Sequence, residues 1–275
     1  MRLGIRTGLL LYGRDELELL RGGCIEVDDE GKIVGVGVGC GLHSIDLGSS
    51  ALLMPPLCNG HVHVFDLGVA NRWEDYPLEV LVQQPRGLKY EFLASQSTHQ
   101  LVEWARKTLE LLEADGVGYA GAYAEEGFRG SLALIQASKH TRLRLRILAQ
   151  PVSKSLVEAL ELADYIGGLG LDTPFDYGLD AVPRLGTLAR SYGVHIHVHV
   201  SEDVVMHELR DYLYALELGA RAAIHGTHLD LGEAEQLLRE GVWLVVCPRS
   251  NCSASPKSRC VPCIAALAPS SKAYR

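Results

Sequence analysis

Two histidines separated by one residue form the first group in this chain that could do chemistry, in the stretch Asn59-Gly60-His61-Val62-His63. Residues two apart in a β-strand point to the same side. His61 and His63 can therefore aim two imidazoles at one point near the end of a strand. Imidazole is a common neutral ligand for zinc and for ferrous iron. Taken alone, this spacing favours a pair of surface histidines in a loop over a metal site.

A second stretch contains more histidines, in the sequence His195-Ile196-His197-Val198-His199-Val200-Ser201-Glu202. Strand alternation puts the histidines on one face and the aliphatic residues on the other. In a barrel, the aliphatic face would pack on helices and the histidine face would line the interior. Buried imidazoles are costly unless they are hydrogen-bonded or bind a metal. Glu202, three residues past His199, is expected at the rim, where a carboxylate can exchange protons; the alternative is an exposed edge strand.

Two weaker motifs also follow apolar runs, Ala223-Ile224-His225-Gly226-Thr227-His228 and Cys247-Pro248-Arg249-Ser250-Asn251. Either one alone indicates little, because a lone histidine at a strand end is usually structural. Catalytic groups of barrel enzymes, however, collect at the C-terminal ends of several strands. The candidate residues follow the first, fifth, sixth and seventh expected strands in one register, which predicts a single shared site.

The elements that must position these residues alternate between strand and helix from residue 51 onward. Apolar runs predict strands at Ala51–Pro55, Val117–Tyr123, Leu145–Pro151, Tyr165–Leu171, Val194–Val200, Ala222–His225 and Val242–Cys247. Helical spacing between them predicts helices such as Gln100–Ala114, Pro183–Tyr192, Val204–Leu218 and Gly232–Arg239. Strands that alternate with helices indicate a parallel sheet, open or closed.

The first fifty residues have a different pattern, which predicts a small β layer ahead of the main domain. Two apolar runs flank the turn Asp28-Asp29-Glu30-Gly31, so residues 23–36 are expected to form a hairpin. The predicted organisation is residues 1–50 as the β layer, 51–267 as a barrel and 268–275 as an irregular tail. Within the barrel, Phe65–Glu91 is expected to be a long irregular insertion, which is more often functional than idle.

The composition limits the partners of this protein. Of its 275 residues, 47 % are hydrophobic and 22 % are charged, which is ordinary for a folded soluble domain. A net charge of −8 without a basic cluster argues against binding to nucleic acid or to a membrane surface. No apolar run is long enough to span a bilayer, and the N-terminus lacks the parts of a signal peptide. A cytoplasmic protein is expected, and a homo-oligomer is left open.

Seven cysteines are then expected to be reduced thiols and not a disulfide framework. Cys260-x-x-Cys263, with Cys252 nearby, could form a redox pair or a zinc knuckle, but sequence drift near the end of the chain is favoured over both. The zinc signature of cytidine deaminases requires Pro-Cys-x-x-Cys. Pro262-Cys263 lacks the second cysteine, so that signature is rejected.

Taken together, the motifs resemble those of the amidohydrolase superfamily, in its deaminase-like branch. Deaminases of cytosine, guanine and adenosine derivatives and the triazine chlorohydrolases are the most similar members, and imidazolonepropionase is a near relative. The hairpin at residues 23–36 followed by Met54–His63 is similar to the family's entry into its first barrel strand. His199-Val200-Ser201-Glu202 matches its HxxE motif, and Cys247–Asn251 resembles its CPxSN turn. The resemblance runs from about residue 23 to about residue 267.

The resemblance implies a TIM-type (β/α)₈ barrel with a small β-sandwich built from both chain ends, of which residues 1–50 would be a part. It implies that His61, His63 and His199 bind one metal ion, Zn²⁺ or alternatively Fe²⁺. Glu202 would carry protons, and His225 would polarise the substrate or water. The implied reaction is hydrolytic deamination of a nucleobase- or amidine-like ring in a small-molecule substrate. No strand offers a lysine suited to carboxylation, which favours a single ion.

The chain also departs from the family. The family's fourth ligand, an aspartate after the eighth strand, has no counterpart, because Ala268–Arg275 resembles nothing. We therefore expect a barrel without its eighth unit, with bare edges on the strand before His61 and on Val242–Cys247. A gap beside His61 and His63 would then expose Leu52, Leu53 and Val245. The alternatives are ring opening of a cyclic amide, dechlorination on the same scaffold, or an inactive truncated remnant.

Overall fold

The computed structural model of this chain describes residues 2–250, except 14–15, 42, 71–75, 77, 83–85 and 154. Two compact units divide the chain, the first formed by residues up to Pro56 and the second starting at Leu57. The predicted tail and the cysteines at positions 252, 260 and 263 lie outside the described residues. No helix in the described part of the chain combines the length and apolar character that crossing a membrane requires.

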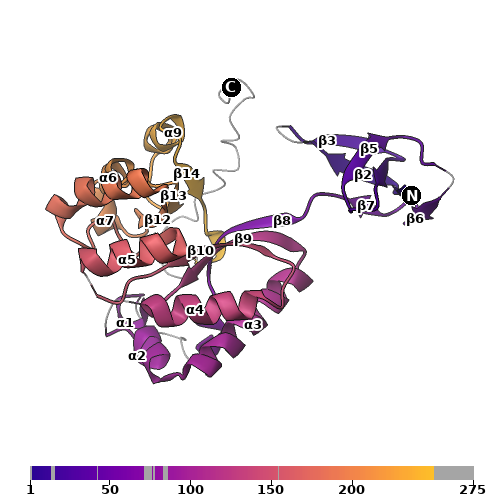
Figure 1. Cartoon of the computed structure of the whole chain (residues 1–275). Coiled ribbons are helices and arrows are strands. Elements are labelled where there is room, and N and C mark those ends of the chain that lie inside the picture. The colour runs from indigo at the N-terminus through magenta and orange to yellow at the C-terminus, as the bar shows by residue number, and fades with distance from the viewer. Residues whose placement is uncertain are drawn as a thin grey trace. The chain divides into compact units, whose positions relative to one another are not determined.

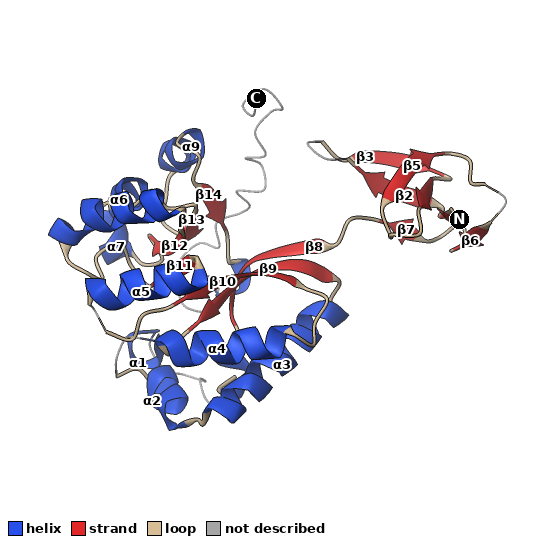
Figure 2. Cartoon of the chain, in the orientation of Figure 1, coloured by secondary structure: helices blue, strands red, loops and turns tan. Residues whose placement is uncertain are grey.

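The first unit consists of two small sheets (Figures 1 and 2). One has the order β5-β4-β1-β6 and the other the order β3-β2-β7. The predicted hairpin is confirmed, since β4 and β5 pair antiparallel with Ile25 opposite Val36. The strands are β1 Leu3–Arg6, β2 Leu9–Tyr12, β3 Glu18–Arg21, β4 Cys24–Val27, β5 Ile33–Gly37, β6 Ser44–Asp46 and β7 Leu52–Leu53.

A disulfide links Cys24 in β4 to Cys40 in the segment before β6, with Cα atoms 5.7 Å apart. The expectation that the cysteines are reduced thiols is therefore wrong for this pair. A cytoplasmic compartment predicts reduced thiols, whereas the fold brings two thiols that are 16 residues apart in sequence within bonding distance. Cys58 and Cys247 are free cysteines in the described residues.

The second unit is built on a parallel sheet with the order β14-β13-β12-β11-β10-β9-β8. Each strand pairs with its neighbour in sequence, as in a barrel that is built one βα unit at a time. The predicted TIM-type barrel fold, with a small β layer ahead of it in the sequence, is confirmed, and the described residues contribute seven parallel strands to the barrel. The strands are β8 Leu57–His63, β9 Val117–Ala124, β10 Arg144–Ala149, β11 Gly168–Leu171, β12 His195–Val200, β13 Ala222–His225 and β14 Trp243–Val245.

Helices follow the strands and lie on the outer side of the curved sheet (Figure 2). The longest, α3, begins with a capping box in which Ser97 and Gln100 exchange side-chain and backbone hydrogen bonds. The helices are α1 Leu78–Val82, α2 Leu88–Ser95, α3 Thr98–Ala114, α4 Gly127–Ser138, α5 Leu156–Ile166, α6 Val182–Tyr192, α7 Val204–Glu208, α8 Asp211–Glu217 and α9 Leu231–Arg239, with short 3₁₀ turns at Asp66–Gly68 and Leu179–Ala181.

The barrel begins later than the sequence predicts. Residues 51–55 are not its first strand, because Leu52 and Leu53 form β7 and pair with β2 in the first unit. The first barrel strand is β8, which itself carries His61 and His63 at its C-terminal end. The apolar run at residues 51–55 fits a strand of the first unit as well as a strand of the barrel, and its pairing with β2 decides for the first unit.

Two predicted segments differ from the structure in their helices. The insertion Phe65–Glu91 is not wholly irregular, since it contains α1 and the first turn of α2. The single helix expected at Val204–Leu218 is two helices, α7 and α8. The break falls at Arg210, whose φ of 55° is left-handed and cannot continue a right-handed helix.

The core lies between the sheet and the helices. Ile196, Val198 and Val200, the aliphatic face of β12, are fully buried and pack in one cluster with residues of α6 and α8 such as Leu185 and Ala215. This burial confirms the alternation predicted for β12. It leaves the opposite face, with the histidines, directed to the barrel interior.

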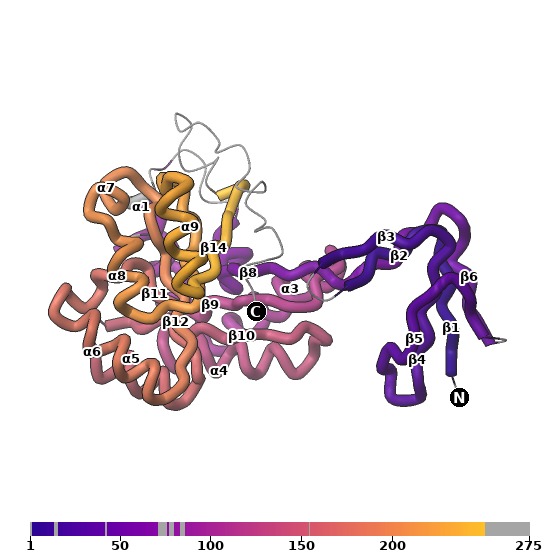
Figure 3. Tube along the Cα trace, turned by 90° about the horizontal axis from the view of Figure 1, so that it is seen from above, coloured from indigo at the N-terminus to yellow at the C-terminus, as the bar shows by residue number. Residues whose placement is uncertain are grey.

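The two outer strands of the sheet do not pair with each other within the described residues. They nevertheless approach closely, since a Cβ built on Gly60 of β8 would lie 2.8 Å from Cγ1 of Val245 in β14 (Figure 3). The bare edges stay a prediction, and the side chain of Val245 occupies part of the predicted gap. Of the residues expected to line that gap, Leu52 and Leu53 belong to β7 instead.

Candidate metal centre

Four imidazole rings from three strands gather at the C-terminal side of the barrel. His61 lies 4.6 Å from His63 and 4.9 Å from His199, measured between ring centroids. His63 and His199 are 5.5 Å apart, and His199 and His225 are 5.1 Å apart. The predicted convergence of rings from β8 and β12 is thus present, and β13 adds His225. Rings packed this closely can share one small ligand.

The ligand-bearing atoms of His61, His199 and His225 all lie within 4.8 Å of one another. His63 falls in a second such group, with Asp66 and Glu125. The geometry therefore brings His225, which the sequence assigned to substrate polarisation, as close to the centre as the expected ligands. Which of the four histidines bind a metal remains a prediction.

Hydrogen bonds orient two of these rings. Nδ1 of His63 lies 2.6 Å from Oε1 of Glu125, and Nδ1 of His199 lies 2.9 Å from the carbonyl oxygen of Leu171. Both partners are acceptors, so each Nδ1 donates and each Nε2 carries the free lone pair. Metal-binding histidines are typically held in this way, with a carboxylate or carbonyl on the far nitrogen.

Burial keeps His61 and His199 uncharged. Desolvation lowers the pKa of both imidazoles well below the usual 6.5, and the neighbouring histidines lower these pKa values further. In addition, Nδ1 of His61 is buried without a hydrogen-bond partner in the described residues. A buried nitrogen of this kind costs free energy unless it binds something. The neutral nitrogen donors fit Zn²⁺ or Fe²⁺.

The remaining candidate, Glu202, lies beside the ring cluster. Its Oε1 is 3.5 Å from Nε2 of His225. The turn that carries Glu202 is held by Asp211, whose carboxylate accepts hydrogen bonds from the backbone N–H and the hydroxyl of Ser201, both at 2.6 Å. His225 and Ser201 both have positive φ, 72° and 48°. Such backbone strain is often found at functional sites.

Comparison with known proteins places this arrangement in a family. Residues 52–262 match the amidohydrolase family, which is more than half of the chain. The chain belongs to the amidohydrolase family. Its sequence is 25 % identical, over 90 % of the chain, to a 5-methylthioadenosine/S-adenosylhomocysteine deaminase of Pyrococcus furiosus.

Solved structures share the amidohydrolase fold seen here. A guanine deaminase from C. acetobutylicum with bound guanine has a TM-score of 0.72 at 17 % identity, covering 93 % of this chain and 70 % of that chain. An adenosine deaminase from Xanthomonas campestris with bound zinc has a TM-score of 0.71 at 19 % identity, covering 92 % and 64 %. At these identities the likeness establishes the fold alone.

This amidohydrolase is shorter than its relatives. It spans 64 % of the length of the Pyrococcus deaminase. It spans 57 % of the length of relatives from Methanocaldococcus jannaschii and Methanothermobacter thermautotrophicus, to which it is 26 % and 27 % identical. Activities of the whole relatives therefore come to this amidohydrolase only as proposals.

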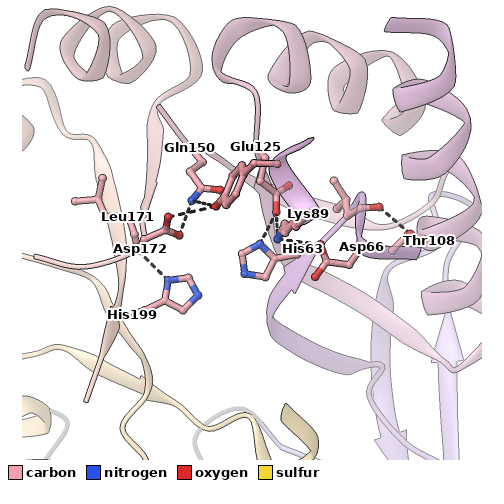
Figure 4. Close-up of polar contacts among 11 residues, drawn as sticks. His63, Asp66, Lys89, Thr108, Glu125, Gln150, Leu171, Asp172 and His199 are labelled. Atoms are coloured by element: carbon pink, nitrogen blue, oxygen red, sulfur yellow. Dashed lines mark hydrogen bonds and ion pairs between the residues drawn. The ribbon is translucent and has the colours of Figure 1, made fainter. Parts of the chain in front are cut away.

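Three charged residues beside the histidines of this amidohydrolase went unnoticed in the sequence. Nζ of Lys89, on α2, lies 2.5 Å from Oε1 of Glu125 and 2.8 Å from Oδ1 of Asp66. Figure 4 shows Lys89 and His63 converging on the same Glu125 carboxylate. Lys89 and Glu125 are both buried, at 2 % and 0 % exposure. The adjacent ammonium and His63 hold the pKa of Glu125 low, at about 2, despite its burial.

A second polar network of the amidohydrolase ties α2 to the ends of β10 and β11. The amide of Gln150 donates to Asp172 and to the hydroxyl of Tyr90, the latter at 3.0 Å. Tyr90 donates in turn to Asp172 at 3.3 Å. Burial and the nearby Asp176 raise the pKa of Asp172 to about 7. A weak sequence signal existed, since Glu125 and Asp172 come within two residues after the expected strands Val117–Tyr123 and Tyr165–Leu171, and Gln150 is the last residue but one of Leu145–Pro151.

Tyr123 forms the floor beneath the histidines. Its ring centroid lies 4.6 Å from that of His61, 5.1 Å from His63 and 5.2 Å from His199. A Cβ built on Gly170 would lie 2.5 Å from Cε1 of this ring, so β11 must have glycine there. The buried Tyr123 supports three of the four imidazoles from one side.

Proposed function

We propose that this chain is a metal-dependent hydrolase that deaminates a nucleobase- or amidine-like ring. In the proposed site His61, His63 and His199 hold one ion, Zn²⁺ or alternatively Fe²⁺. The observation that carries the proposal is the convergence of these rings, with His225 and Glu202, at the C-terminal ends of β8, β12 and β13. The substrate class is supported by the deaminase relatives, which are known by name to act on such compounds.

A bound Zn²⁺ would supply the nucleophile, because it lowers the pKa of water from about 15.7 towards 7. Glu202, near the open side of the ring cluster, would take a proton from the attacking water and pass it to a ring nitrogen. The same carboxylate would then take the proton of the hydroxyl group added to the carbon and pass it to the departing amine, so that water and the amino compound yield a carbonyl compound and ammonia. His225 would stabilise the negative charge that develops on the substrate as the water attacks.

His63 is the proposed third ligand because of its partner. Glu125 fixes Nδ1 of His63 as a donor and leaves Nε2 free, whereas Nε2 of His225 faces Glu202. We expect His63→Ala to lose bound zinc and His225→Ala to keep zinc while losing turnover. His207→Ala is the matched control, because His207 lies on α7 outside the ring cluster. If His225→Ala loses zinc and His63→Ala retains it, the two roles are exchanged.

The reaction itself is tested by product detection on the zinc-loaded chain. Guanine, adenosine, 5-methylthioadenosine and S-adenosylhomocysteine are the substrates to try, with ammonia release as the readout. Ring-opened acid from a cyclic amide, or chloride from a chlorinated triazine, would point to the other reactions of this scaffold. A folded, zinc-containing chain that yields none of these products would be an inactive remnant, and the proposed function would be rejected.

A further inference from the structure

The ammonium group of Lys89 lies where a second metal ion could be bound. It is within 2.8 Å of Asp66 and 2.5 Å of Glu125, and the Lys89 side chain is almost fully buried. Lysine is seldom fully buried unless it is paired. The residue comes from α2, in the segment after β8, so it enters the site from outside the ring of strands.

The groups around this ammonium form a ligand set of their own. His63, Asp66 and Glu125 offer ligand atoms that lie within 4.8 Å of one another. Oε2 of Glu125 is buried and has no hydrogen-bond partner in the described residues, so this carboxylate has an unused donor atom. The two carboxylate oxygens are suitable ligands for Zn²⁺ or Mn²⁺, and Nδ1 of His63 becomes a third donor atom when an ion displaces its proton.

Charge explains why lysine and a metal ion would exclude each other. The two carboxylates carry about two negative charges, which the Lys89 ammonium offsets in part. Nζ of Lys89 lies 2.8 Å from Asp66 and 2.5 Å from Glu125. A divalent cation bound by the same two carboxylates would therefore lie directly beside this ammonium. Like charges at such short range in a buried site repel strongly.

We propose that the Lys89 ammonium occupies a second cation position of this centre and thereby restricts the chain to a single metal ion. The inference rests on the proposed function for the first ion only. The second cation position is defined by His63, Asp66 and Glu125 and does not depend on which reaction the first ion supports. Lys89 also holds Glu125 against His63, which makes it a positioning residue for that ring.

The test replaces the ammonium with an uncharged side chain of similar length. Lys89→Met, the unaltered chain and Lys89→Met/Asp66→Asn are dialysed against Zn²⁺ or Mn²⁺, and bound metal per chain is measured. We expect Lys89→Met to bind about one ion more than the unaltered chain. The double variant should lose this gain, because it lacks one carboxylate ligand. Lys139→Met, at the exposed C-terminal end of α4, is the control and should change nothing.

Anomalous scattering from a metal-loaded Lys89→Met crystal should place the additional ion between Asp66 and Glu125. If Lys89→Met is unfolded without metal, the readout becomes circular dichroism during metal titration. Mn²⁺ or Zn²⁺ should then restore folding in Lys89→Met and not in the double variant.

The inference is overturned if folded Lys89→Met binds no more metal than the unaltered chain, or if neither ion refolds an unfolded Lys89→Met. An unaltered chain that binds no ion, beside a Lys89→Met chain that binds one, would reject the proposed function and still support the second position. The two hypotheses therefore fail separately.

Discussion

Glu202 occupies a position that suits proton transfer better than metal binding. Its carboxylate is partly exposed and lies 3.5 Å from His225, and it is in neither group of candidate ligand atoms. The Ser201–Asp211 hydrogen bonds hold the turn that carries it. In the proposed site, the histidines would therefore bind the metal ion and Glu202 would transfer the proton.

Glu202→Gln should keep bound metal and lose turnover. Glutamine preserves the shape of the side chain but cannot accept and return a proton at neutral pH, and general acid–base groups contribute about 10²–10⁴-fold. The expected result is a fall in kcat of at least about 100-fold, with unchanged metal content by mass spectrometry. Glu208→Gln, on the exposed side of α7, should leave both values unchanged. Retained turnover in Glu202→Gln would mean that another group carries the proton.

Polar contacts attach the short helix α2 to the barrel. Lys89 and Tyr90, adjacent on α2, bind two different carboxylates, Glu125 after β9 and Asp172 after β11. A helix of this length has little stability of its own. Its position therefore depends on the ionisation of the groups that it contacts.

Asp172 gives this dependence a pH signature. Its pKa is raised to about 7 by burial, above the usual value of about 3.9 in an unfolded chain. A raised folded pKa contributes stability below about pH 4, and this contribution is lost as the pH rises from about 4 through about 7. The loss is about 1.4 kcal/mol per pH unit for one proton.

Asp172→Asn removes this titration while it keeps an acceptor for Gln150 and Tyr90. The stability of the variant relative to the unaltered chain should therefore rise between pH 4 and 7, with a slope approaching about 1.4 kcal/mol per pH unit. Urea unfolding of the metal-free proteins at several pH values measures it. Asp164→Asn on α5, where Asp164 is exposed, should show no such slope. Parallel pH profiles for Asp172→Asn and the unaltered chain would contradict the assignment.

The two outer strands of the barrel sheet, β8 and β14, are the feature of the whole molecule that bears most on its stability. The terminal strands β8 and β14 touch at Gly60 and Val245 without pairing in the described residues. Apolar side chains remain exposed along both strands, among them Leu57 at 50 % and Trp243 at 61 %. Unpaired, apolar strand edges favour aggregation or pairing with another chain.

A version of the chain extended through an eighth strand and helix should be more stable. Burial of each apolar side chain contributes about 1.5–3 kcal/mol, against a typical net stability of about 5–15 kcal/mol. We expect a rise of several degrees in Tm, because 1 kcal/mol corresponds to about 2–4 °C for a domain of this size. Differential scanning calorimetry, zinc content and ammonia release are compared in the two proteins. Equal values of all three would refute the idea that an eighth unit stabilises this fold.

The sequence alone predicted the alternation of strands and helices in the barrel and the histidines at the strand ends, but it placed the first barrel strand too early. Strand alternation is local and repeats every two residues, so the histidine face and the aliphatic face of β12 follow directly from His195–Val200. The βα repeat likewise indicates a parallel sheet, and the shared register at strand ends predicted that His61, His63 and His199 would converge.

Tertiary structure decided what depends on pairing and on contacts distant in sequence. Leu52 and Leu53 fit a barrel strand by composition, yet their hydrogen-bond partners lie in β2. The Cys24–Cys40 disulfide depends on two thiols being brought together by the first unit. Lys89 looks like an ordinary surface lysine in sequence, and only the fold buries its ammonium between Asp66 and Glu125. Burial of a charge requires partners supplied by other elements, and no local pattern encodes those partners.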